Sequence, residues 1–351
     1  MIAGALSLLL LAVAIGWAAG GARPREDAAA PVAAIAWVAT TAASVLLVIA
    51  GGEGLAGRGE RLGFGTIPAM GTIGLGVDRL SGLFLVVTFG AAALVLLAGL
   101  TRPARLAGAR RRLPAAAGLV CLATAVVILA DDLFLLLAGW EALGFAFYLA
   151  VGYDRHREGR SRAAVLAAGF SKVSGGLLLL GGGILAVQAG SVALDDLGGH
   201  AGIATAAGYV LLIGGFAVKV GLVPAHVWLP PAYTAAPGPM RALLAGVAVN
   251  VGFYGLWRTL DVLGAPPVWL ACLVLLVAGL SALLGISHAA VHADLRGMIA
   301  WSSVENAGVI TAGYGVGLVG AAVGLPELTA AGLLAGTMQL IAHAEIGRAH
   351  V

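Results

Sequence analysis

Charged side chains are scarce in this sequence: Asp, Glu, Lys and Arg make up 11% of its 351 residues. Ordinary soluble domains carry about 25% charged and about 45–50% apolar residues. Here 60% of the residues are hydrophobic, and the mean hydropathy is +1.01. This composition excludes a soluble globular enzyme, a disordered chain and a nucleic-acid-binding protein, although the isoelectric point is about 9.1. The sequence predicts a polytopic membrane protein.

Cysteine and cofactor motifs are scarce as well. Cys121 and Cys272 lie in apolar runs far apart in the sequence, which indicates neither a disulfide framework nor a cysteine metal site. The sequence has no glycine-rich nucleotide loop between a strand and a helix, no Walker lysine, no iron–sulfur cysteine cluster and no evident Ser-His-Asp order. We therefore expect no cofactor, no metal and no redox or hydrolytic chemistry in this chain. Ion movement is the function that remains.

Long apolar segments are abundant. A helix crosses the hydrocarbon core of a bilayer in about 20 residues, with its backbone polar groups paired internally. At that length the sequence predicts an all-α bundle of about eleven spans. They begin near Ile2, Pro31, Leu80, Leu113, Leu133, Ala163, Ala201, Ala242, Pro267, Gly297 and Leu328. We expect the first span to stay uncleaved, because no charged segment precedes it and ten more spans follow.

The arginines indicate the orientation of these spans. Counted loop by loop, one side of the membrane collects thirteen arginines and the other side collects four. Short loops rich in cations stay in the cytoplasm. We therefore expect a multi-pass protein of the cell membrane with its amino terminus outside the cytoplasm. The basic isoelectric point reflects this loop bias and not a nucleic-acid surface.

Lysine is rarer than arginine. Of 20 Lys and Arg residues only Lys172 and Lys219 are lysines, and both lie within apolar spans. Biased codon usage explains the low number, but it does not explain why both lysines are in the membrane. Arginine stays protonated above pH 12, whereas burial or a neighbouring cation lowers the pKa of a lysine by several units. A site that must release a proton needs a lysine.

Two glutamates also interrupt apolar spans: Glu141 within residues 133–152, and Glu305 within WSSVENAGV. A charge at the bilayer centre costs about 2.5–3.5 kcal/mol on insertion scales, so such residues are normally paired or line water. For Glu141 and Lys219 we favour function over a static ion pair that fixes helix packing. For Lys172 and Glu305, which lie closer to charged loops, both interpretations stay open.

The seventh span is interrupted shortly after Lys219. Pro224 removes a backbone donor and predicts a kink at about one helical turn after Lys219. Irregular backbone at membrane depth is tolerated only against protein or a water-filled cavity, and ion-coupled transporters place discontinuous helices at their ion sites. His226 follows Lys219 by seven residues, which is the same face of an undistorted helix. It is either a proton relay or a hydrogen-bonded core residue.

His288, Asn250 and His343 are further polar side chains in apolar runs. Each can hold one water in a relay. Each can also bridge two helices through a side-chain hydrogen bond, which contributes about 0.6 kcal/mol on average. We place His288 ahead of the other two as a relay candidate.

Three stretches resemble the antiporter-like subunits shared by respiratory complex I, Mrp cation/proton antiporters and membrane-bound hydrogenases. The first, DLFLLLAGWEALGFAFYLAVGY (132–153), is similar to the fifth helix of that family. The second, FAVKVGLVPAHVWLPPAYTAAPGPMRALLAGVAVNVGFYGLWR (216–258), is similar to its broken seventh helix and its eighth. The third is ADLRGMIAWSSVENAGVI (293–310), whose SVEN resembles the large membrane subunit of formate hydrogenlyase and hydrogenase-4-type complexes. The amino-terminal third matches mainly in helix number and at Asp78.

The resemblance implies roles for particular residues. The mid-helix glutamate of the family falls on Glu141 and its key lysine on Lys219, which makes these two the proton-translocating pair. The chain then divides into amino-terminal helices over 1–112, a proton-conducting core over 113–344 and a tail over 345–351. The implied partners are other membrane subunits of a respiratory or hydrogenase complex, the lipid bilayer, and protons or sodium as the transported ion.

Two positions depart from the family pattern. Asn250 stands where the eighth helix of many members has a lysine, and an amide does not take up and release a proton at physiological pH. Either water or His288 takes this place, or the subunit is a degraded pump. Lys172 falls near a position where some members have an arginine beside an aspartate, and Gly175 stands in place of that aspartate.

The end of the sequence departs from the family altogether. Residues 339–344 resemble the eleventh helix, which continues into further helices in other members. Here EIGRAHV (345–351) follows instead, and it reads as the translation of a common sequencing-adapter oligonucleotide with its in-frame stop. We expect the natural protein to continue beyond Ala344.

The predicted function is proton translocation by a membrane subunit of an NADH:quinone oxidoreductase-like or membrane-bound hydrogenase complex. The Glu141–Lys219 pair and a hydrated polar relay would carry the proton. One alternative is a sodium/proton antiporter subunit of the Mrp type. The other is a structural anchor whose buried ion pair only specifies helix packing. Neighbouring genes for hydrogenase or quinone-reductase subunits, as against small antiporter genes, would separate the first two.

Overall fold

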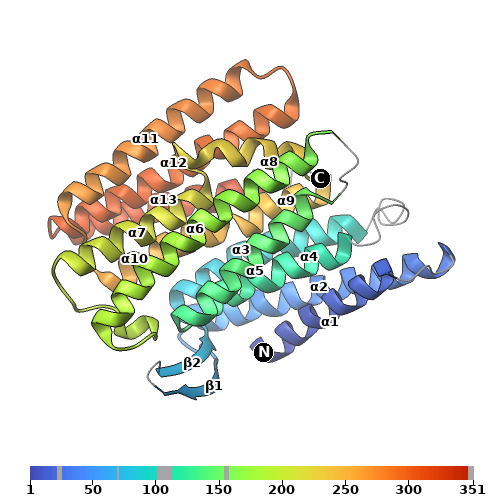
Figure 1. The fold of residues 1–351 in the computed structure, drawn as a ribbon, viewed down its shortest axis with the longest axis horizontal. Helices are drawn as coiled ribbons and strands as arrows, with labels where there is room; N and C mark the ends of the chain where they lie inside the picture. The colour runs from blue at the N-terminus through green and yellow to red at the C-terminus, as the bar shows by residue number, and fades with distance from the viewer. Residues whose placement is uncertain (22–25, 69–70, 101–112, 154–157, 347–351) are drawn as a thin grey trace.

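The computed structural model describes residues 1–21, 26–68, 71–100, 113–153 and 158–346. Helices dominate these residues and follow the predicted spans (Figure 1). The first six are α1 (Ile2–Gly21), α2 (Glu26–Leu55), α3 (Arg79–Leu100), α4 (Leu113–Leu129), α5 (Leu133–Val151) and α6 (Arg160–Ala189). The seventh span comprises α7 (Ile203–Val220), a 3-10 turn η3 (Ala225–Trp228) and α8 (Leu229–Ala235). The remainder are α9 (Gly238–Leu243), a π-helical turn η4 (Leu244–Ala248), α10 (Asn250–Leu263), α11 (Val268–Val291), α12 (Leu295–Ala322) and α13 (Pro326–Ile346).

The chain is a multi-pass membrane protein, as predicted. Among the described residues, seven helical stretches are long and apolar enough to cross a membrane, and α1 and α4 are shorter apolar helices. The outward orientation of the amino terminus stays a prediction. Residues 347–351 of the predicted tail and the arginine-rich loop over 101–112 lie outside the described residues.

The helices lie side by side in three groups (Figure 1). In the first group, α1 packs against α2 and α4, and α2 packs against α3. At the opposite edge α12 lies between α11 and α13. Helices α5 to α10 occupy the middle, where α10 contacts α3, α7 and α12. The broken seventh span is therefore enclosed by protein on several sides, which is the condition for irregular backbone at membrane depth.

A small β-hairpin between α2 and α3 was not predicted from the sequence. Strands β1 (Arg61–Ile67) and β2 (Gly71–Gly76) pair antiparallel, with a bulge between Gly63 and Gly65. Asp132 fixes β2 to the start of α5, because its carboxylate accepts from the Gly74 N–H at 3.0 Å and from the Leu135 N–H at 2.9 Å. The buried carboxylate caps α5 and holds the hairpin at the same end of the bundle.

An ion-pair cluster joins α3 to α10 at this end of the molecule. The Asp78 carboxylate lies 2.6 Å from the Arg258 guanidinium and accepts from the Ser81 N–H at 2.7 Å. The same guanidinium contacts Asp261 at 2.8 Å and donates to the Tyr254 hydroxyl at 3.1 Å. Asp78, at which the amino-terminal third resembles the family, thus ties that third to the core.

Acid should weaken this cluster. Burial opposes ionisation of Asp78, but the hydrogen bond and charge of Arg258 outweigh it and hold the pKa of Asp78 below its ordinary value. The stability from this ion pair is fully present above the unfolded pKa of about 3.9, and it is lost as the pH falls through the folded pKa. We expect the melting temperature of the detergent-solubilised protein to decrease as the pH is lowered below about 4.

The variant Arg258→Met should have a lower melting temperature at neutral pH. It should also lose the acid-dependent step, which is the decrease in melting temperature that the Asp78–Arg258 pair causes below about pH 4. The matched control is Arg58→Met, which removes the exposed Arg58–Glu53 pair and should leave the step in place. An unchanged acid-dependent step in Arg258→Met would contradict the assignment.

Candidate functional site

The seventh span breaks earlier than predicted. Helix α7 ends at Val220, because Gly221 adopts the left-handed conformation with φ of 80°, which glycine takes without steric penalty. A Cβ at this position would also meet the Leu229 side chain. Pro224, the predicted position of the break, instead precedes η3. The irregular segment therefore begins two residues after Lys219, which lies in the last turn of α7.

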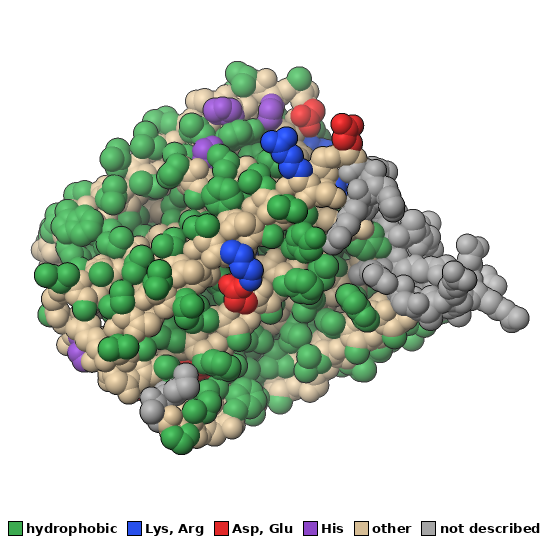
Figure 2. Space-filling view, in the orientation of Figure 1, with side chains coloured by type: hydrophobic (Ala, Val, Ile, Leu, Met, Phe, Trp, Pro, Cys, Tyr) green, Lys and Arg blue, Asp and Glu red, His purple; other side chains and the backbone are tan. Residues whose placement is uncertain are grey.

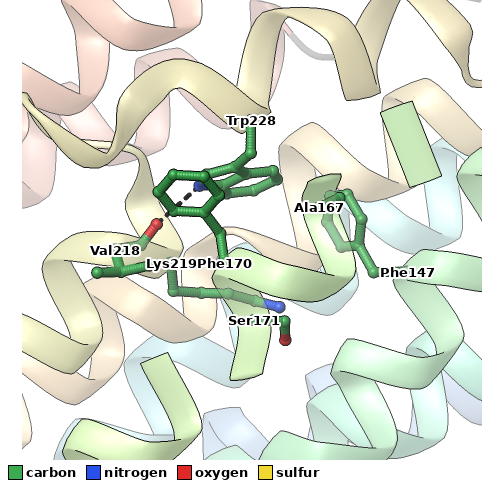
Figure 3. A pocket seen from close by; sticks show the side chains of 7 residues that line it. All are labelled: Phe147, Ala167, Phe170, Ser171, Val218, Lys219 and Trp228. Carbon is green, nitrogen blue, oxygen red and sulfur yellow. Dashed lines mark hydrogen bonds between the residues drawn. The ribbon is translucent and has the colours of Figure 1, made fainter. Parts of the chain in front are cut away.

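Lys219 lies inside the bundle among aromatic rings. Its side chain is 3% exposed, and its Nζ is 5.0 Å from the Phe147 ring centroid and 5.6 Å from that of Trp140. Figure 3 shows the amine beside Ser171 in a pocket enclosed by Phe147, Phe170, Trp228 and other side chains. The cavity has a volume of about 10 Å³, which is close to the space that one water needs.

Trp228 connects the two halves of the broken span. Its indole Nε1 donates to the Val218 carbonyl at 2.9 Å (Figure 3), and its ring meets Phe147 edge to face at 5.3 Å. The last carbonyls of a helix have no partner within that helix. The indole satisfies one of them and closes one side of the Lys219 pocket.

Glu141 forms its direct ion pair with Lys172 of α6 and not with Lys219. Figure 2 shows a positive and a negative side chain in contact over α5 and α6, on a face that is otherwise mostly hydrophobic. The exposed fractions of this pair are 43% for Glu141 and 70% for Lys172. Glu141 also attracts the Lys219 ammonium electrostatically, but without direct contact. The structure thus places one carboxylate within the influence of both lysines.

Helices α5, α6 and α7 are held together by a buried serine. The Trp140 indole donates to the Ser174 hydroxyl at 3.1 Å, and this hydroxyl donates to the Gly215 carbonyl at 2.7 Å. The Trp140 ring also packs edge to face on Phe216, with centroids 5.3 Å apart. These contacts fix the ring over which the Lys219 amine lies.

His226 and His288 lie on a different side of the broken span from Lys219. Both imidazoles pack on Trp301, at centroid distances of 5.5 Å and 4.2 Å, and His288 is stacked on the indole. A groove of about 470 Å³ runs along this side, lined by His226, Val227, Pro230, Pro231, Thr234, His292, Gly297 and Trp301. His292, 6.4 Å from Trp301, was not singled out from the sequence, because it follows the last turn of α11 and no motif marks it.

The structure brings the other relay candidates into neither the Lys219 pocket nor this groove. Asn250 is fully buried, and its Nδ2 donates to the Gly246 carbonyl of η4 at 2.8 Å. His343 is buried on α13 at 5% exposure. The Glu305 carboxylate accepts from Asn306 at 2.9 Å within α12. Ser171 and the aromatic rings of the pocket were not predicted from the sequence, because serines and aromatics are common in apolar helices.

Comparisons with known proteins give a family and several relatives. The profile described as "NADH:quinone oxidoreductase/Mrp antiporter, TM" matches residues 130–346. An uncharacterized protein of Mycobacterium tuberculosis is 33% identical over 311 residues, which is 85% of this chain and 48% of that protein. Hydrogenase-4 component B of Escherichia coli is 40% identical over 146 residues, which is 41% of this chain and 22% of that protein.

The fold has a counterpart among solved structures. A chain of the membrane-bound sulfane sulfur reductase, an archaeal respiratory membrane complex, superposes with a TM-score of 0.78 at 19% identity. The match covers 99% of this chain and 69% of that one. The chain described here spans about half the length, 48%, of the M. tuberculosis relative.

Proposed function

This chain belongs to the NADH:quinone oxidoreductase/Mrp antiporter family, as its three motifs predicted, and we propose that it translocates protons through Lys219. The Glu141–Lys172 ion pair sets the affinity of that lysine for its proton. The protein acts as an antiporter-like membrane subunit of a larger respiratory or hydrogenase-type complex.

The observation that carries the proposal is a buried amine that no carboxylate of the described residues contacts. Lys219 is 3% exposed and lies over two aromatic rings. Burial of an unpaired ammonium costs several kcal/mol of desolvation free energy. Its attraction to aromatic faces offsets only about 2 kcal/mol of that cost in a desolvated site. The protonated and neutral forms of such an amine are therefore closer in free energy than those of a lysine in water.

Competition between two lysines for one carboxylate supplies the switch. When the Glu141 carboxylate contacts Lys172, its attraction for Lys219 is weakened, and burial favours the neutral amine. When the carboxylate turns toward Lys219, the ammonium is favoured. The predicted Glu141–Lys219 pair is retained in this proposal, with Lys172 as the second partner.

The exposure of the Glu141–Lys172 pair supports an attached subunit. Exposed apolar side chains surround the pair on α5 and α6, among them Phe134, Phe145 and Val173. An ion pair facing lipid at this depth is costly, whereas polar groups that face a neighbouring protein or water are tolerated. We propose that another membrane subunit covers this face.

Proton uptake by vesicles tests the function. The natural protein, purified together with the subunits that accompany it, would be reconstituted into liposomes, with a potential set by K⁺ and valinomycin and a pH-sensitive dye inside. We expect potential-driven proton uptake above that of protein-free vesicles, with the same rate in the absence of Na⁺. Uptake that requires Na⁺ on the opposite side would contradict a proton uniport and support sodium/proton exchange. No uptake above protein-free vesicles would contradict translocation.

A further inference from the structure

Helices α5 and α6 carry reciprocal gaps at their contact. On α6, Gly175 faces Glu141, and a Cβ there would overlap the carboxylate oxygen Oε1. On α5, Gly144 faces Ser171, and a Cβ there would overlap the serine hydroxyl. Each helix therefore lacks a side chain at the position where the other helix presents a polar group. Such paired gaps let two polar side chains lie between closely packed membrane helices.

The same geometry places the Ser171 hydroxyl between two groups of the proposed site. Glu141 and Gly144 are three residues apart on one face of α5, and Ser171 and Gly175 are four apart on one face of α6. Residues at these spacings are neighbours, with Cβ atoms about 5–6 Å apart. The hydroxyl thus lies about one helical turn from the Glu141 carboxylate, and its other neighbour is the Lys219 amine (Figure 3).

The lining of the Lys219 pocket leaves little choice of polar partner. Four of its seven lining side chains are apolar: Phe147, Ala167, Phe170 and Val218. The Trp228 indole N–H is already bonded to the Val218 carbonyl. Within the described residues that line this pocket, the Ser171 hydroxyl is the polar side-chain group left to face the amine and a water in the cavity. A hydroxyl both donates and accepts, so it can orient a water for either direction of proton transfer.

We propose that Ser171 is a positioning residue that holds one water between Lys219 and Glu141. The Lys219 ammonium gives a proton to this water, and the water passes one of its own protons to the Glu141 carboxylate. Lys219 and Glu141 are then both neutral, and Lys172 keeps its charge. The reverse transfer restores the Lys219 ammonium and the Glu141 carboxylate. The inference rests on the proposed function and adds to it the path between the two groups.

The test compares proton uptake in the vesicle assay for a set of variants, with Lys219→Met as the blocked reference. Ser171→Ala removes the hydroxyl and leaves space for water. We expect proton uptake to fall about tenfold, which is less than the roughly 100-fold or greater loss expected when the proton-transferring group itself is removed. Ser171→Thr keeps a hydroxyl and should restore most of the rate. All variants should melt within a few degrees of the parent protein, since none creates a large void.

A glycine pair supplies an independent arm of the experiment. Gly144→Ala should push the Ser171 hydroxyl aside and reduce uptake as Ser171→Ala does. The matched control is Gly176→Ala on α6, where an added Cβ meets nothing within 4 Å, and its rate should be unchanged. A larger deuterium isotope effect in Ser171→Ala than in the parent would support a disrupted water path.

Parent-like uptake in Ser171→Ala, with Lys219→Met blocked, would overturn the Ser171 path and leave the proposed function intact. Equal losses in the Ala and Thr variants, with Gly144→Ala unaffected, would also overturn it, since packing would then be the cause. Parent-like uptake in Lys219→Met would instead remove the proposed function itself.

Discussion

Replacement of Lys219 with Met is expected to reduce proton uptake about 100-fold or more, which is the scale of losing a positioned acid–base group. Methionine has a similar length and suits an apolar pocket lined by Phe147, Phe170 and Trp228. The variant should therefore fold and pack as the parent does while lacking the group that binds the proton. The measurement is potential-driven uptake per reconstituted protein, together with the melting temperature in detergent.

Lys219→Arg separates proton release from positive charge. Arginine keeps the cation but does not release its proton at physiological pH, so this variant should be nearly as inactive as Lys219→Met. A structural anchor needs only the charge, and under that alternative Lys219→Arg would assemble and behave as the parent. Uptake above half of the parent rate in Lys219→Met would exclude Lys219 as the proton carrier.

Replacement of Glu141 with Gln is expected to have the second largest effect, a loss of uptake of about 100-fold, which is the lower end of the effect of losing an acid–base group. The amide is isosteric, but it neither attracts the Lys219 ammonium nor accepts its proton. Lys172→Met should also slow uptake, because the carboxylate then has no alternative partner and stays with Lys219. The double variant should lose less than the product of the two single losses, since both act on one switch.

The amount of assembled complex distinguishes two roles of Glu141: exchange of its carboxylate between Lys172 and Lys219, or an ion pair that only specifies helix packing. For Glu141→Gln we expect normal assembly with reduced uptake per assembled complex. The opposite pattern, poor assembly with unchanged uptake per complex, would show that the ion pair only specifies packing. Blue-native electrophoresis of the membranes, followed by reconstitution of the purified complex, gives both quantities.

Sequence patterns predicted the helices well because the bilayer imposes one dominant requirement, an apolar segment long enough to cross it. The broken seventh span was also predictable, since Pro224 lacks the backbone donor that a regular helix needs at that position. The position of the break differed because Gly221, with its positive φ, ends the helix before Pro224 is reached.

Side-chain partners were less predictable than helices. The sequence gives no measure of how α5, α6 and α7 rotate about their axes, and these rotations decide that Glu141 contacts Lys172. The same limit applies to His226, because the irregular backbone after Val220 turns it toward Trp301 and away from the pocket. The β-hairpin was missed because its glycine-rich strands are short and its support comes from the distant Asp132.

The hydrogen bond from the Trp228 indole to the Val218 carbonyl acts as a strut across the unwound backbone. Val218 directly precedes Lys219, so a displacement of η3 along the membrane normal would displace the end of α7 through this hydrogen bond. A conformational change in the groove beside Trp301 would thereby move the Lys219 amine without transfer of a charge between the two sites. Loss of the hydrogen bond would allow α7 and η3 to move independently.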